Sequence, residues 1–121
     1  MRSLLATAVV FLLLAAGTAS ASLVPPFPRL AGAWSYAKIN VTIRGIPHTF
    51  VLDRGRIVQA SASQLTLRER DGSYVVVRLS LLTIVRVDGV LATVRDLRRR
   101  MVAETMRIDG GAAVRVRATS F

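Results

Sequence analysis

The sequence predicts an all-β chain: a small barrel of about six to eight short antiparallel strands with one short helical turn, preceded by a signal peptide. Three observations support this fold class. From Trp34 onward apolar and polar residues alternate with a period of two. Glycines interrupt the alternating runs at spacings of roughly 8–12 residues, which is typical of short strands joined by turns. An uncharged, mostly apolar run opens the chain.

Residues 1–21 have the layout of a cleaved secretory signal peptide. Arg2 precedes an apolar run of 13 residues from Leu4 to Ala16, and small residues follow at Ala19 and Ala21. The run is shorter than the ~20 residues that a membrane-spanning helix needs. We therefore expect cleavage after Ala21, no membrane span afterwards, and a bacterial protein that is periplasmic, cell-wall associated or extracellular. An uncleaved anchor is the alternative.

Residues 22–33 are rich in proline, at Pro25, Pro26 and Pro28. Proline has no backbone N–H for a sheet and disfavours helix in the residue before it, so this segment is predicted to be an extended tether. Residues 34–121 then form the barrel domain, with the helical turn within residues 92–100. The predicted strands are residues 40–43, 49–52, 56–61, 64–69, 73–79, 83–87, 102–108 and 113–118.

The register of the hairpin around Asp71-Gly72 can be predicted from its apolar pattern. A three-residue loop, 70–72, places Leu67 opposite Val75 and Leu65 opposite Val77 on one face. A two-residue turn would pair a leucine with an arginine and is the less favourable alternative, because a slip of one residue exposes the whole apolar set.

The same alternation can be applied to two later strands. It points Val85 and Val87 inward with Arg86 outward, and Val114 and Val116 inward with the two arginines beside them outward.

The chain resembles a family of small bacterial β-barrel domains of unknown function, usually exported and often in tandem, over about residues 55–118. The resemblance implies a barrel and brings no catalytic residues. Arg99 and Arg100 stand where the family tends to have Pro-Gly. The matching positions are Gly55-Arg56-Ile57, Leu65-Thr66-Leu67, Asp71-Gly72, Thr83, Val85, Val87, Gly89, Asp96-Leu97, Met101 and Ala113.

The composition favours an anionic partner and offers little for catalysis. Seventeen Lys and Arg residues against seven acids give a net charge of +10, although a GC-rich genome would also favour arginine. Without cysteine, the chain has no thiolate ligand or disulfide. His48 is the single histidine, and three of the aspartates precede glycines, as turns prefer. No acid, base and nucleophile converge, so we expect no enzyme, no metal site and no cofactor.

Arginines at outward strand positions and in the helical turn are the candidate anion-binding residues, because guanidinium groups bind phosphate and carboxylate in a bidentate manner. Few aromatic residues accompany them, which disfavours specific nucleic-acid binding. The sequence therefore predicts a non-enzymatic envelope module that binds a protein or an anionic polymer. The alternative is a structural or assembly subunit that pairs through an edge strand. The candidates are Arg68, Arg78, Arg86, Arg98, Arg99, Arg100, Arg115 and Arg117.

Overall fold

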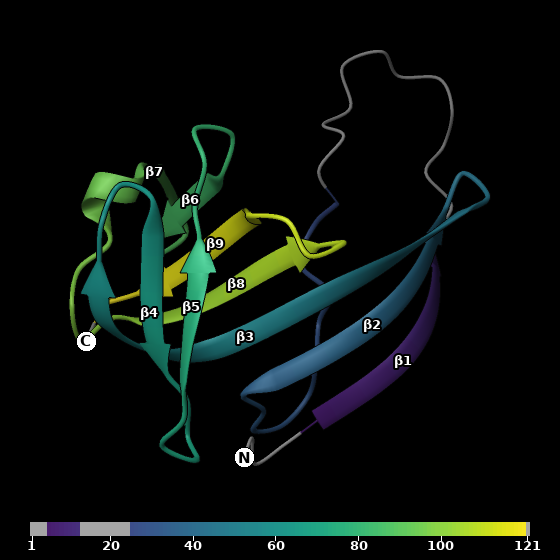
Figure 1. Cartoon of the computed structure of the whole chain (residues 1–121), viewed down its shortest axis with the longest axis horizontal. Coiled ribbons are helices and arrows are strands. Elements are labelled where there is room, and N and C mark those ends of the chain that lie inside the picture. The colour runs from purple at the N-terminus through teal and green to yellow at the C-terminus, as the bar shows by residue number, and fades with distance from the viewer. Residues whose placement is uncertain (1–4, 13–24, 121) are drawn as a thin grey trace.

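The computed structural model describes residues 5–12 and 25–120, and this part of the chain is all-β (Figure 1). The predicted fold class is confirmed at this level. The strands are β1 (Leu5–Leu12), β2 (Tyr36–Ile43), β3 (Ile46–Ala60), β4 (Gln64–Arg68), β5 (Tyr74–Arg78), β6 (Ile84–Val87), β7 (Val90–Ala92), β8 (Val102–Ile108) and β9 (Ala113–Thr119). The 3-10 helix η1 (Val94–Asp96) lies within the predicted helical turn, and the Thr93 N–H donates to the Asp96 carboxylate at 2.9 Å.

The 15-residue strand β3 organises the sheet (Figure 1). Its residue Arg56 pairs with Arg68 of β4 on one edge and with Val102 of β8 on the other. β2 also pairs with β3, and the sheet continues from β8 through β9 and β6 to β7. Among the described residues β5 pairs only with β4, and β7 only with β6, so the sheet is open and a closed barrel is not confirmed.

Two hydrophobic clusters lie on opposite faces of β3. Ile57 belongs to a cluster enclosed by the curled part of the sheet, together with Leu67, Val77 and other residues of β4 to β9. Phe50 and Leu52 belong to a second cluster, which includes Ile39, Val41 and Trp34. Even-numbered and odd-numbered residues of a strand point to opposite faces, so one long strand serves both clusters.

The predicted register of the β4–β5 hairpin is confirmed. Leu65 pairs with Val77 and Leu67 with Val75, and all four side chains are buried. Gly72 has a φ of 87°, the left-handed conformation that a three-residue loop requires at this position.

The prediction that Val114 points inward beside Val116 is wrong. The β8–β9 register shifts between Met106 and Arg107, whose partners on β9 are Arg115 and Ala113. This bulge places Val114 against the second cluster, whereas Val116 stays in the first. Residues on one side of a bulge point to the opposite face from the one that strict alternation predicts. The apolar pattern alone does not show where the bulge lies.

The proline-rich segment lies against the sheet along the part that is described. Residues 25–33 have no strand or helix, yet Pro25 is buried, and Phe27 and Leu30 pack against the second cluster. The Arg115 Nε–H donates to the Pro25 carbonyl at 2.7 Å.

Within the predicted signal peptide the structure describes only β1, which pairs in parallel with β2 from Leu5 opposite Tyr36 to Leu12 opposite Ile43. The predicted cleavage site at Ala21 lies outside the described residues, so the signal peptide stays a prediction. In the described part of the chain, no helix has the length and apolarity to cross a membrane.

Candidate anion-binding site

Two arginines face each other near the end of β4 where the chain turns into β5. Arg56 of β3 and Arg68 of β4 are cross-strand partners, and both are exposed. Directly opposed residues of an antiparallel pair point to the same face with their side chains close together, and like charges there are destabilising. A pair of this kind suits an anion placed between the two guanidinium groups.

A cavity of about 420 Å³ adjoins this pair. Arg54 and Arg70 also line it, so four arginines border one space. The acidic residue in the lining is Glu69, which is buried, and the lining is completed by Gly55 and Val102. We call this space the arginine cavity. Arginine around a concave site gives planar, bidentate donors that match phosphate and carboxylate oxygens.

Gly55 allows the wall of the arginine cavity to form. A Cβ atom at this position would lie 2.5 Å from the backbone oxygen of Arg68 and 3.2 Å from the Leu67 Cβ. A contact of 2.5 Å with backbone is too short for any side chain, so only glycine lets β3 approach the end of β4 this closely. Arg56 and Arg68 therefore sit side by side because the residue next to Arg56 has no side chain.

A second row of charges crosses the sheet next to the cavity. Arg54 of β3 pairs with Glu104 of β8, Glu104 with Arg117 of β9, and Arg117 with Arg86 of β6. Glu104 accepts from Arg117 at 2.9 Å and lies 3.4 Å from the Arg54 guanidinium. One carboxylate thus bridges two arginines, and the face carries more positive than negative charge.

Two of these arginines contact aromatic rings of the segment that precedes β2. The Arg54 guanidinium lies 4.3 Å from the centre of the Trp34 ring, and that of Arg117 lies 4.8 Å from the centre of Phe27. Such cation–π contacts orient a guanidinium without neutralising it. The packed segment therefore positions charges of the site.

The predicted candidates fall into separate places. Arg68 lines the arginine cavity, and Arg86, Arg115 and Arg117 lie on the adjoining face. Burial, and secondly the charge of Arg86, lowers the pKa of Arg115 from its ordinary value. Arg78 lies at the other end of β5 from the cavity, where it approaches the Gly110 carbonyl at 3.5 Å.

The remaining candidates follow η1. Arg98 and Arg99 border a shallow hollow against Val58 and Gln59. The Arg100 N–H donates to the Ile57 carbonyl at 2.9 Å, and its φ is 76°. The structure thus does not bring all the predicted arginines into one band.

Three arginines of the cavity, at positions 54, 56 and 70, were not among the sequence candidates. A signal for them exists in the two triplets Arg54-Gly55-Arg56 and Arg68-Glu69-Arg70. These triplets end up side by side because β3 and β4 are joined by a short turn. A register shift between Ile57 and Gln59 sets Arg56 opposite Arg68, and a regular hairpin register would have placed Ile57 there instead.

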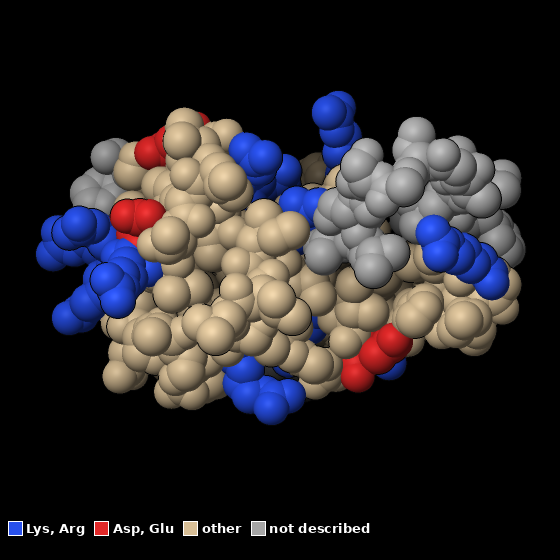
Figure 2. Space-filling view, turned by 90° about the horizontal axis from the view of Figure 1, so that it is seen from above, with Lys and Arg blue, Asp and Glu red and all other residues tan. Residues whose placement is uncertain are grey.

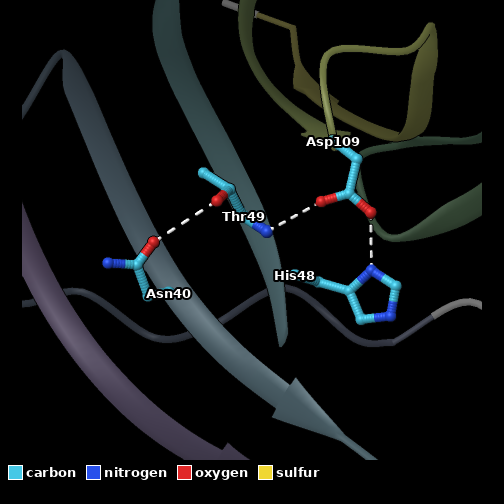
Figure 3. A network of polar contacts seen from close by, with 4 residues as sticks. All are labelled: Asn40, His48, Thr49 and Asp109. Atoms are coloured by element: carbon cyan, nitrogen blue, oxygen red, sulfur yellow. Dashed lines mark hydrogen bonds and ion pairs between the residues drawn. The ribbon is translucent and has the colours of Figure 1, made fainter. Parts of the chain in front are cut away.

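The single histidine takes part in a turn-fixing network at the other end of the sheet (Figure 3). His48 Nδ1 contacts the Asp109 carboxylate, which also accepts the Thr49 N–H at 2.9 Å. Thr49 Oγ1 donates to the Asn40 amide oxygen at 3.3 Å. The Thr49 hydrogen bond, with a smaller contribution from His48, lowers the pKa of Asp109. The network ties β2 and β3 to the β8–β9 turn.

A partly buried ion pair lies on the face of the first cluster. The fully buried Asp53 accepts from Arg107 at 2.7 Å. Their strands β3 and β8 are adjacent, with Asp53 opposite the buried Thr105. Breaking a pair of this type leaves a charge in the interior and is strongly destabilising. Among the described residues, no group of three or more His, Cys, Asp or Glu side chains is arranged to hold a metal ion.

Comparison of the chain with protein-family models, curated proteins and solved structures finds no match. The resemblance to exported β-barrel domains therefore remains a prediction from the motifs.

Proposed function

We propose that the chain is an exported, non-enzymatic β module that binds an anionic polymer of the bacterial envelope through the arginine cavity. The observation that carries this proposal is the cross-strand pair Arg56–Arg68 beside a cavity that Arg54 and Arg70 also line. Four arginines line the cavity beside the buried Glu69, and Glu104 lies 3.4 Å from one of them, Arg54, which leaves a local excess of positive charge. A bound phosphate or carboxylate group relieves the repulsion that the unbound site carries.

The chemistry of the cavity favours charge recognition over base recognition. Its lining contains no aromatic side chain on which a base could stack. Trp34 lies under Arg54 and is buried, so it presents no free stacking surface. This is why an anionic polymer suits the site better than a nucleic acid read by sequence.

Titration with two probes at two salt concentrations tests the proposal. Polyphosphate and polyglutamate present phosphate and carboxylate groups on flexible chains. We expect the Arg56→Gln/Arg68→Gln variant to bind both probes more weakly. The slope of log affinity against log salt concentration should become shallower by roughly 0.7 per lost contact, as for single-stranded phosphodiester chains. The Arg29→Gln/Arg78→Gln variant removes the same charge outside the cavity. Equal losses in the two variants would contradict a localised site.

A second candidate function is an assembly subunit that pairs through an edge strand, and the β1–β2 pairing favours it. All eight residues of β2 pair with β1, which lies within the predicted signal peptide. Signal cleavage would leave the β2 edge open, and open edges accept another strand. Light scattering of the processed chain over a range of concentrations tests this function: growth in mass with concentration supports it, and a constant monomer mass contradicts it.

A further inference from the structure

A turn far from the arginine cavity exposes two leucines. Leu81 and Leu82 occupy the central positions of the turn between β5 and β6, and their relative exposures are 104% and 86%. Turns at Asp71-Gly72, Asp88-Gly89 and Asp109-Gly110 use the residue types that turn geometry favours. Neither turn geometry nor core packing explains the leucines.

Hydrogen bonds hold this turn in place and keep the leucines outward. The Thr83 N–H donates to the Ser80 carbonyl at 3.1 Å, and the Ser80 N–H donates to Thr83 Oγ1 at 2.9 Å. Thr83 Oγ1 in turn donates to the Ala113 carbonyl of β9 at 2.7 Å. The apolar tip is therefore attached to the sheet and is preorganised for contact.

Arginines lie at the same end of the molecule. The Leu79 N–H donates to the Ser63 carbonyl at 2.7 Å, which joins the leucine turn to the β3–β4 loop. That loop borders η1, because residues 60–62 and Arg95 line one hollow. Arg98 and Arg99 follow η1 and are exposed. Asp96 is the acid among them, and it is engaged with Thr93.

Viewed from above, this end has an uncharged centre (Figure 2). Several basic side chains lie at the left, the side on which Figure 1 places η1, with acidic side chains beside them, and others lie at the upper, lower and right edges. An apolar tip beside cationic side chains is the arrangement that enters an anionic membrane interface, because leucine partitions into the headgroup region while arginine contacts lipid phosphates.

We propose that this end docks on an anionic lipid surface, with Leu81 and Leu82 inserted and Arg95, Arg98 and Arg99 contacting phosphate headgroups. The inference is independent of the arginine cavity, which lies by the β4–β5 turn. It assigns a role to the predicted candidates Arg98 and Arg99, which the cavity does not include. Several kinds of surface suit an apolar tip. The net charge of +10 favours an anionic one.

A fluorescent label at the tip tests the insertion. The chain has no cysteine, so Leu82→Cys carries a polarity-sensitive dye at one site. Vesicles of phosphatidylglycerol and phosphatidylcholine in equal amounts should shift its emission to the blue, and vesicles of phosphatidylcholine alone should not. The matched control is Ile46→Cys, which is also exposed and begins β3, at the opposite end of that strand from the β3–β4 loop. An aqueous emission at position 82 on the anionic vesicles, or an equal shift at position 46, would overturn the proposal.

Charge variants test the headgroup contacts. Each arginine near an anionic surface contributes about a fivefold gain in affinity, so the Arg95→Gln/Arg98→Gln/Arg99→Gln variant should bind these vesicles about a hundredfold more weakly. The Arg29→Gln/Lys38→Gln/Arg44→Gln variant loses the same number of exposed charges outside both this end and the arginine cavity, and should change vesicle affinity much less. Equal weakening in the two variants would refute specific docking by this end.

Discussion

Arg56 and Arg68 are direct cross-strand partners on β3 and β4, and Gly55 is the residue that lets their strands meet. A sheet gains nothing in stability from two like charges placed opposite each other. The pair occurs beside a cavity that two more arginines line, and this arrangement is the basis of the proposed anion site.

If repulsion between these arginines is uncompensated, Arg56→Gln should stabilise the free protein. We expect a gain of about 0.5 kcal/mol in the free energy of unfolding at low salt, since like-charge cross-strand pairs cost roughly this much. Added salt should shrink the gain by screening the repulsion. Urea unfolding at two salt concentrations measures it. Arg78→Gln, whose cross-strand partner is Gln64, is the control and should show no gain.

Gly55→Ala should destabilise the chain by about 2 kcal/mol, because the new methyl group meets backbone that must move. Gly111→Ala is the matched control, since a Cβ there meets its nearest atom, the Ile108 carbonyl oxygen, at 3.4 Å. Thermal unfolding of both variants gives the comparison. Similar melting temperatures for the two would show that β3 and β4 do not approach as closely as the structure has them.

The stability supplied by Asp109 should depend on pH in acid. Hydrogen bonds lower its pKa from the ordinary value of 3.8 in the folded chain, so its contribution is present above that value and is lost as pH falls through the folded value. Asp109→Asn should therefore be less stable than the wild type above the ordinary pKa of 3.8, and the difference should narrow as pH falls below that value. A difference that persists unchanged in acid would contradict this role for the carboxylate.

Arg100 has a φ of 76°, which suits glycine better than a residue with a branched side chain. Arg100→Val should cost about 1–2 kcal/mol in the free energy of unfolding, whereas Arg100→Gly should cost little, because relief of strain offsets the added freedom of the unfolded chain. Arg99→Val is the control for loss of a neighbouring exposed arginine. Equal melting temperatures for the two variants of Arg100 would argue against the left-handed conformation.

The predictions from sequence succeeded where a pattern is local. The hairpin register follows from apolar pairing of Leu65 with Val77 and Leu67 with Val75, and the required conformation of Gly72 follows from the loop length. The helical turn was predicted in the same way, because the alternation of apolar and polar residues breaks there.

Features that depend on several strands at once were less accessible. A closed barrel needs pairing between strands distant in sequence, and the apolar alternation looks the same in an open sheet. The bulge that turns Val114 to the second cluster has no apolar signature. The arginine cavity was only partly anticipated, because Arg54 and Arg56 approach Arg68 through strand pairing and a glycine contact that composition does not reveal.

The most direct test of the central claim follows individual arginine side chains while polyphosphate is added. Nuclear magnetic resonance of the guanidinium Nε–H groups, assigned with single Arg→Gln variants, reports which of them meet the anion. We predict that the signals of Arg54, Arg56, Arg68 and Arg70 shift together at the lowest polyphosphate concentrations, while Arg78 stays in place. Equal shifts of all arginine signals, erased together by salt, would mean that the charge is spread over the surface and that the cavity binds nothing.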